Sequence, residues 1–263
     1  LTSNRYVEIG NDVYMQYKKL DGGKYQELEN KNVDTGFGLD RLLLFLNKLD
    51  DGYKTDLFSG AISYLESASN KVYDDDEVAR KAMRIIADHT RTAVMLIGDV
   101  NGITPSNTGA GYILRRLIRR AGRDSRDLGI NSLEILGVAK VFIEKVYDTA
   151  YPLLIEKEDF ILSELKKEIK KFEATLVAGM KEFDKTVTGI ERKNGFMQAK
   201  DPAYIPETSI GGKAAFRLYD TYGFPLELTI ELALERGFTV DEEGFKEAFK
   251  AHQELSKAQA QAA

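Results

Sequence analysis

The sequence predicts an α+β fold that is mostly α-helical, and three observations support this prediction. Residues 5–20 alternate between apolar and polar side chains, the pattern of a half-buried β-strand. The sequence "DGGK" at 21–24 then signals a turn, so that the strand and the short run after it predict a hairpin. From about residue 53 onward, apolar residues recur at helical spacing almost without interruption.

The first strand places its apolar residues at odd positions: Val7, Ile9, Val13, Met15 and Tyr17. After the turn, "NVDTGFGLDRLLLFLNKL" joins a strand end, two glycines and an amphipathic helix. Glycines at a strand end let a ligand approach the backbone closely. Asp34 can accept hydrogen bonds from an ammonium group, and Arg41 in the first turn of the helix can reach a phosphate. A lone G-x-G is equally the pattern of an ordinary tight turn.

The helical part contains three long patterns. Residues 74–99 open with acids, which favour a helix N-terminus, and Val78, Ala82, Ile85, Ile86 and His89 follow at helical spacing. Residues 153–187 predict a long helix packed against a neighbour, because apolar residues recur there in steps of 4, 4 and 3. Residues 188–212 contain two of the five prolines and several glycines, and they predict a loop or insertion over 188–209. A last helix begins at about Asp241.

Residues 111–126 gather six arginines and one acid in a chain whose formal net charge is −5. On a helix, Arg115, Arg119 and Arg123 form one stripe, with Arg116 and Arg120 beside it. Leu114, Leu117, Ile118 and Ala121 form the opposite, apolar stripe, which can pack on a core. Two interpretations remain open: ion pairs with some of the chain's 42 acidic residues, or contacts with nucleic-acid phosphates, for which arginine is well suited.

Composition excludes several classes of site. The chain has no cysteine, so disulfides and thiolate metal sites are excluded. His89 and His252 are the only histidines and lie far apart in sequence, which argues against a histidine metal cluster but leaves carboxylate sites for Mg²⁺ possible. No apolar run is long enough to span a membrane, and no export signal is recognisable. We therefore expect a cytoplasmic protein without a membrane partner.

Four stretches together resemble one protein family. "VDTGFGLDRL" resembles the third sequence motif of class II aminoacyl-tRNA synthetases, in the form found in alanyl-tRNA synthetases, and "EIGN" with "VYMQY" resembles the strand that precedes it. "IIADHTRTAVMLIGDVNGITPSNTGAGYILRRLIRRA" and "GKAAFRLYDTYGFPLELT" are similar to that family's tRNA-recognition region. The resemblance covers nearly the whole chain, apart from residues 188–209.

The resemblance implies that residues 1–70 are the C-terminal part of an antiparallel-sheet catalytic domain. Residues 71–263 would form a helical tRNA-recognition domain with a long helix. The implied activity of the complete enzyme is the ATP-dependent attachment of alanine to tRNA(Ala), with ATP and Mg²⁺ as cofactors. The first two class II motifs are expected upstream and an editing domain downstream, so that no zinc site is expected in this chain. A fragment of this kind should be inactive alone, and no catalytic residue is assigned to it.

The resemblance also implies roles for individual residues of the first part of the chain. Asn11, Asp34 and Gly36 would bind alanine, and Gly38, Asp40 and Arg41 would bind ATP. Two positions depart from the family pattern: Gly10 stands where tryptophan is usual, and Asp40 stands where glutamate is usual.

For tRNA, the resemblance implies that Asn107 and Asp220 contact one G·U pair in the acceptor stem. The arginine stripe would hold the phosphates of that stem: Arg115, Arg116, Arg119, Arg120 and Arg123. Two other functions remain open on the sequence. One is an RNA-binding relative that does not activate an amino acid, and the other is a helical scaffold whose arginines are paired internally.

Overall fold

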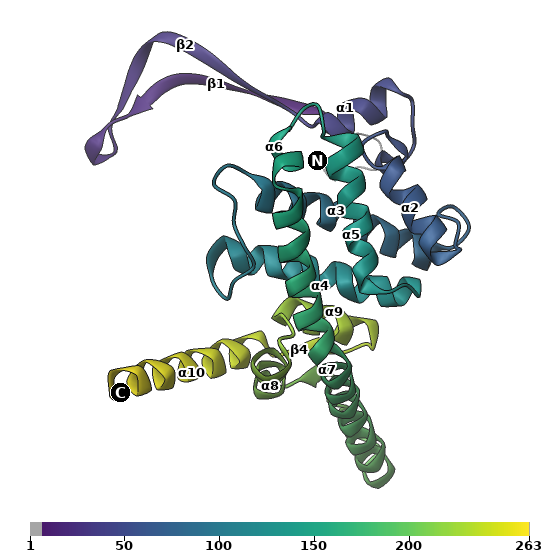
Figure 1. Cartoon of the computed structure of the whole chain (residues 1–263). Helices are drawn as coiled ribbons and strands as arrows, with labels where there is room; N and C mark the ends of the chain where they lie inside the picture. Colours follow the sequence, from purple (N-terminus) through teal and green to yellow (C-terminus); the bar gives the residue numbers. More distant parts are fainter. Residues whose placement is uncertain (1–6, 263) are drawn as a thin grey trace.

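The computed structural model describes residues 7–262 and confirms a mostly helical α+β fold. Figure 1 shows a β-hairpin that projects from a helical body, and one long helix that continues from this body into a second group of helices. The strands are β1 (Gly10–Lys19), β2 (Tyr25–Phe37), β3 (Ser209–Ile210) and β4 (Thr239–Val240). The helices are α1 (Leu39–Leu46), α2 (Ser59–Ser69), α3 (Glu77–Gly98), α4 (Gly109–Leu128), α5 (Ile135–Val141), α6 (Leu153–Glu156), α7 (Glu158–Lys200), α8 (Gly212–Tyr222), α9 (Leu226–Glu235) and α10 (Glu242–Ala262).

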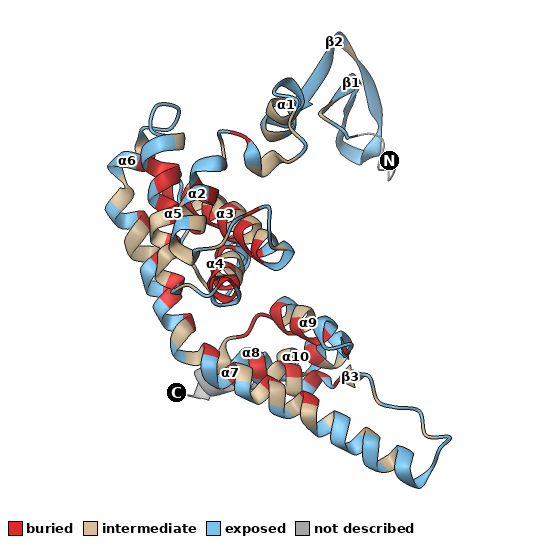
Figure 2. Cartoon of the chain, turned by 90° about the vertical axis from the view of Figure 1, so that its right-hand side faces the viewer, coloured by how far each residue is buried: buried red, intermediate tan, exposed pale blue. Residues whose placement is uncertain are grey.

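The hairpin forms where the sequence predicts it, but its apolar face is not buried. β1 and β2 pair antiparallel, and Gly22 and Gly23 both adopt positive φ in the turn that joins them. Val13 and Tyr17 are more than half exposed, although their alternation predicts a face packed on a core. Figure 2 shows exposed residues along almost the whole hairpin, because no other described element covers it.

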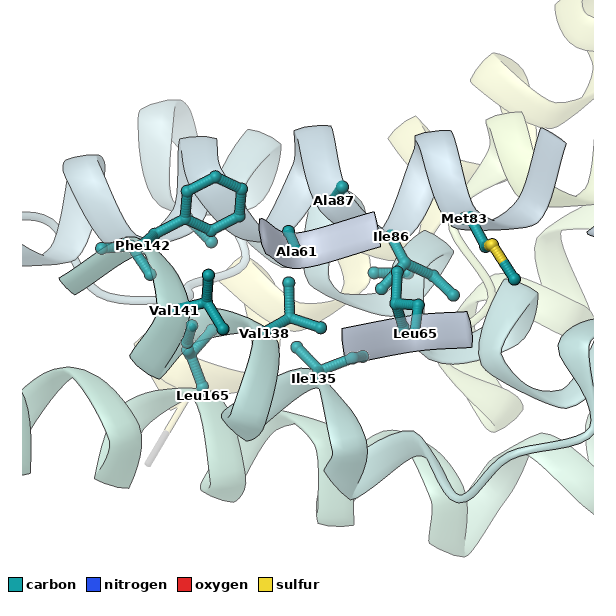
Figure 3. Packing of buried hydrophobic residues seen from close by; sticks show 14 of the residues in the cluster. Ala61, Leu65, Met83, Ile86, Ala87, Ile135, Val138, Val141, Phe142 and Leu165 are labelled. Carbon is teal, nitrogen blue, oxygen red and sulfur yellow. The ribbon is translucent and has the colours of Figure 1, made fainter. Parts of the chain in front are cut away.

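The first lobe consists of α2 to α6 and the first half of α7, which surround one hydrophobic cluster. Figure 3 shows the close packing of Leu65, Ile86, Val138 and Leu165, which come from α2, α3, α5 and α7. α3 begins at an Asp76 cap whose carboxylate accepts the backbone N–H groups of Val78 and Ala79. Ala82 and Ile86 are buried as the sequence predicts.

The second lobe consists of α8, α9, α10 and the second half of α7, with the two-residue parallel strands β3 and β4. Its hydrophobic cluster contains Phe172, Phe183, Leu218 and Phe224. α10 packs on α8 through aromatic rings, including Phe245 against Phe216. The predicted domain boundary between residues 70 and 71 stays a hypothesis. α2 precedes this boundary, and it contributes Ala61 and Leu65 to the core of the first lobe.

α7 connects the two lobes because its buried stripe serves both cores. Ile161, Leu165 and Ile169 lie in the first cluster, and Phe172 and Leu176 lie in the second. The predicted long helix is therefore confirmed. The predicted loop at 188–209 is wrong for residues 188–200, which continue α7.

The helix continues through residues 188–200 because the two glycines of this segment, Gly189 and Gly195, cost only about 1 kcal/mol each in a helix. The first proline of the segment, Pro202, comes after the helix has ended at Lys200. Only the shorter stretch between α7 and β3 is irregular.

Candidate functional site

A pocket of about 440 Å³ lies between the two lobes, and it brings together Asn107 and Asp220. Asn107 belongs to the loop that leads into α4, and Asp220 lies on α8. Lys171 on α7 and His252 on α10 also line the pocket. His252 Nε2 lies 3.7 Å from Asp220 Oδ1. Asn107 and Asp220, which the resemblance implies contact the same G·U pair, thus line the same pocket.

Buried ion pairs form the floor of this pocket. Arg115 and Arg119 of α4 both contact Glu168 of α7, whose side chain is only 5% exposed. Arg115 also donates a hydrogen bond to Asn107 Oδ1, and Arg119 donates one to the carbonyl oxygen of Gly223. Burial lowers the pKa of Arg119, and Glu168 opposes this shift. The arginine keeps its charge in this environment because a guanidinium is effectively always protonated in proteins.

The remaining arginines of the stripe form a ladder of ion pairs with α9. Arg116 lies 2.9 Å from Glu227, and Arg120 lies 2.7 Å from Glu231. The last member, Arg123, contacts Glu235 at 2.7 Å and Glu231 at 3.4 Å, and it also contacts Asp127 of its own helix. The ladder joins the lobes beside a second cavity, of about 730 Å³, which α3, α4 and α9 line.

The arginine helix therefore takes the arrangement that the sequence left open as an alternative: each of the five stripe arginines contacts a carboxylate. Arg119 and Arg123 are 5% and 7% exposed and do not offer a charged surface to a phosphate in this structure. For these two residues the expected phosphate contact stays a prediction, and carboxylates occupy their donors in this structure. Arg116 and Arg120 are more exposed, with 36% and 41% of their side chains accessible.

Asp124 is a buried carboxylate at the far end of the same helix. Its Oδ2 atom has no hydrogen-bond partner, and its closest guanidinium nitrogen, on Arg123, lies 4.0 Å from Oδ1. Burial raises the pKa of Asp124 to about 7, with Glu231 and Asp127 adding to the shift and Arg123 opposing it. This group changes charge near neutral pH.

The residues expected to bind alanine share one face of the hairpin. Asn11 pairs directly with Gly36, and Val13 pairs with Asp34, so the alternation of a strand brings Asn11, Asp34 and Gly36 to the same side. A side chain at position 36 would meet the Asn11 amide oxygen at 3.5 Å, and the glycine leaves this space open. The exposed face fits one wall of a small-ligand site.

Phe37 occupies the space that Gly10 leaves. The two residues pair across the hairpin, and a Cβ atom built at position 10 meets the Phe37 ring. The departure from tryptophan at position 10 is thus accompanied by an aromatic ring from the neighbouring strand, an arrangement known to support glycine in sheets.

The residues expected to bind ATP lie at the start of α1, and two of them already have protein partners. Arg41 donates from Nη1 to the carbonyl oxygen of Glu8 at 2.7 Å. Asp40 receives both of its contacts from Arg91 Nη1, each at 3.1 Å, and this pair ties α1 to α3. The ATP-binding roles of Gly38, Asp40 and Arg41 stay predictions. Among residues 7–262, no group of three or more His, Cys, Asp or Glu side chains could hold a metal ion.

Sequence reasoning missed the carboxylates that pair with the arginine stripe. Glu227, Glu231 and Glu235 recur every four residues on α9, a spacing that matches the arginine spacing on α4. That match was the available signal for these three residues. Glu168 gave none, because it lies within the apolar stripe of α7.

No helix in the described part of the chain is long and apolar enough to cross a membrane.

Comparisons with known proteins agree with these features. The whole chain, residues 1–263, matches the family described as tRNA synthetases class II (A). The alanine–tRNA ligase of Borreliella afzelii (strain PKo) is 44% identical over 253 residues, which cover 96% of this chain and 40% of that protein. The alanine–tRNA ligase of Treponema pallidum (strain Nichols) is 42% identical over 257 residues, which cover 98% of this chain and 40% of that protein. The alanine–tRNA ligase of Exiguobacterium sibiricum is 40% identical over 263 residues, which cover 97% of this chain and 27% of that protein.

This chain spans 40% or less of the length of these three relatives. The match confirms the resemblance that the four sequence stretches indicate, including the glycine-rich strand end and the arginine helix. The chain belongs to the class II (A) family of tRNA synthetases.

Proposed function

We propose that the chain is part of an alanine–tRNA ligase, and that its own task is to recognise the acceptor stem of tRNA(Ala) through a G·U pair. The first part is supported by relatives named alanine–tRNA ligase, which are 40–45% identical to this chain over the aligned residues. One observation carries the second part: Asn107 and Asp220, on different lobes, line one pocket.

The chemistry of the two side chains suits a paired reading of one base pair. Asp220 can only accept hydrogen bonds when it is ionised. Arg115 already donates to the side-chain oxygen of Asn107, Oδ1, which leaves the side-chain NH₂ group of Asn107 to donate. One donor and one acceptor that line the same pocket can test the displaced geometry of a wobble pair, whose minor-groove edge includes the guanine amino group.

Lys171 and His252 add positive or titratable groups to the same pocket, where they can approach the sugar-phosphate backbone. Arg116 and Arg120 are further candidates for phosphate contacts, since their pairs with Glu227 and Glu231 are partly exposed. Exposed ion pairs contribute about 0–1 kcal/mol, so exchange of a glutamate for a phosphate is energetically accessible. In this proposal, Arg119 and Arg123 are structural.

The experiment compares the binding of two labelled acceptor-stem hairpins that differ only in a G·U or G·C pair. Asn107→Ala and Asp220→Ala should each reduce the preference for the G·U stem by about 1–3 kcal/mol, as for other base-edge contacts. Because both residues address one pair, the double variant should lose less than the sum of the two single losses. The preference in kcat/KM for aminoacylation by the full-length parent measures the same discrimination in the transition state.

Two exposed positions provide matched controls. Asn101→Ala lies in the loop before Asn107, and Asp56→Ala removes an exposed carboxylate outside the pocket. Both should keep the wild-type preference, whereas Arg116→Ala should weaken both stems alike. The assignment would be refuted if the wild-type chain showed no G·U preference in binding and its parent showed none in kcat/KM. It would also be refuted if the Asn107→Ala and Asp220→Ala variants kept the wild-type G·U preference.

A further inference from the structure

Glu168 is a buried charge at the junction of the two lobes. It lies on α7 next to Ile169 of the first hydrophobic cluster, about one turn before Phe172 of the second. Its side chain is 5% exposed, so removal from water is nearly complete. A carboxylate in such a place must be paired and hydrogen-bonded, or its burial costs several kcal/mol. Its contacts are therefore obligatory parts of the fold.

Those contacts are two arginines of α4. Glu168 Oε1 lies 2.7 Å from Nε and 2.6 Å from Nη2 of Arg119, and it lies 3.2 Å from Nε of Arg115. A planar guanidinium that is fixed at one edge presents its other donors in a fixed direction. The position of one carboxylate on α7 thus sets the direction of two further hydrogen bonds.

Each of these hydrogen bonds ends at or beside one of the residues proposed to read the base pair. Arg115 donates to Asn107 Oδ1, which fixes the orientation of the Asn107 amide. Arg119 donates to the carbonyl oxygen of Gly223. Gly223 is the left-handed cap of α8, with φ of 64°, and this cap ends the helical turn that carries Asp220.

We propose that Glu168 is a positioning residue that sets the geometry of Asn107 and Asp220 relative to each other. The proposal rests on the proposed function, since it needs these two residues to read one base pair. Glu168 reaches Asn107 through Arg115, and it reaches the end of α8 through Arg119. It does not touch the RNA itself.

The charge of Glu168 matters more than its volume in this arrangement. In Glu168→Gln, an amide oxygen can still accept at the position of Oε1, but the negative charge that pairs with two guanidinium groups is lost. The arginines are then held less firmly and can reorient, together with the Asn107 amide and the end of α8. Misplacement of these groups affects recognition of the correct pair more than general attraction to RNA, because phosphate contacts carry no sequence information.

The test uses the complete chain and the two acceptor-stem hairpins with G·U and G·C pairs, at a temperature where every variant is folded. Glu168→Gln should lower the ratio of G·U to G·C affinity roughly tenfold, within the range measured for coupled residues. Its affinity for the G·C stem should change less than about twofold. In a Glu168→Gln/Asn107→Ala double variant, the loss of preference should be smaller than the sum of the two single losses, because both changes disturb Asn107, whereas a general loss of stability would add to the loss.

Asp51→Asn is the matched control. Asp51 is also a carboxylate that pairs with an arginine, and its side chain is 13% exposed. It accepts from Arg84 at 2.5 Å and from Tyr73 at 2.6 Å, but it lies outside the pocket. It should lose stability and keep the wild-type preference. If Glu168→Gln does not fold, Arg115→Lys replaces it, because lysine keeps the charge but lacks the planar fork that bridges Glu168 and Asn107. This variant should show the same loss of preference.

The outcomes separate the two proposals. Wild-type chain without G·U preference, or with a preference that survives Asn107→Ala, overturns the proposed function. A preference that depends on Asn107 but persists in Glu168→Gln, or in Arg115→Lys when Glu168→Gln does not fold, overturns only the positioning role. Equal losses in Asp51→Asn and Glu168→Gln also overturn it, since the effect would then follow stability alone.

Discussion

Removal of Arg119 should destabilise the protein far more than removal of Arg116, although both belong to the same stripe of α4. Arg119→Ala leaves Glu168 with a weaker and more distant partner in a buried site. It also removes a donor from the carbonyl oxygen of Gly223 and a guanidinium that lies 5.3 Å from the centre of the Phe172 ring. Arg116→Ala breaks one pair with Glu227 in which both side chains are more than a third exposed.

The expected magnitudes differ several-fold. Removing one partner of a buried ion pair costs about 3–5 kcal/mol, and removing one partner of an exposed pair costs about 0–1 kcal/mol. For a chain of this size, each kcal/mol lowers the melting temperature by about 2–4 °C. Arg119→Ala should therefore lower the melting temperature by about 6–20 °C, and Arg116→Ala by less than about 4 °C.

Thermal unfolding followed by circular dichroism, at low salt and at about 0.5 M salt, measures both effects. High salt should abolish the small effect of Arg116→Ala and leave most of the effect of Arg119→Ala, because buried pairs are screened much less than exposed ones. Equal melting temperatures for the two variants would refute the burial argument. They would favour a stripe that is free in solution and available to RNA.

Two further predictions concern buried groups. Burial raises the pKa of Asp124 to about 7, so between about pH 4 and 7 the folded state holds a proton that the unfolded state has lost, and stability should fall as pH rises through this window. Asp124→Asn should remove up to roughly 4 kcal/mol of this loss of stability. The variant should therefore gain more in melting temperature at pH 8 than at pH 5. An equal gain at both pH values would contradict the prediction. Gly179→Ala should destabilise the second lobe by about 1–3 kcal/mol, because its Cβ would overlap the buried Phe224 ring. Gly189→Ala on the same helix has nothing within 4 Å of its Cβ and should instead stabilise the protein slightly. A Gly179→Ala variant as stable as the wild type would be inconsistent with the packing.

Local patterns predicted the elements of this fold well. Odd-even alternation and the "DGGK" turn were enough to find the hairpin, because strand pairing across a short turn depends on adjacent residues. The 4-4-3 spacing was enough to find α7 and its buried stripe. Prediction failed at residues 188–200, where Gly189 and Gly195 suggested a break that neighbouring helix-forming residues overcame.

The sequence names candidate site residues but not their contacts, and the roles of these residues stay predictions. Asn107 and Asp220 were identified through a family resemblance, and only the fold shows that they line one pocket. The partners of the arginines depend on how α7 and α9 pack against α4, which no local pattern specifies. Val13 and Tyr17 illustrate the same limit, because their alternation predicts an apolar face but does not say what covers it.

Because α7 runs without a break through both lobes, its length sets the angle between the two halves of the proposed recognition surface. Each residue of an α-helix adds about 100° of rotation and 1.5 Å of rise. One residue inserted between Ile169 and Phe172 would rotate the second lobe about the helix axis by about 100° and carry Asp220 away from Asn107. Only changes of about seven residues, close to two full turns, would restore the facing direction, and they would shift the lobe by roughly 10 Å. The length of this segment is therefore as strictly constrained as any side chain in the pocket.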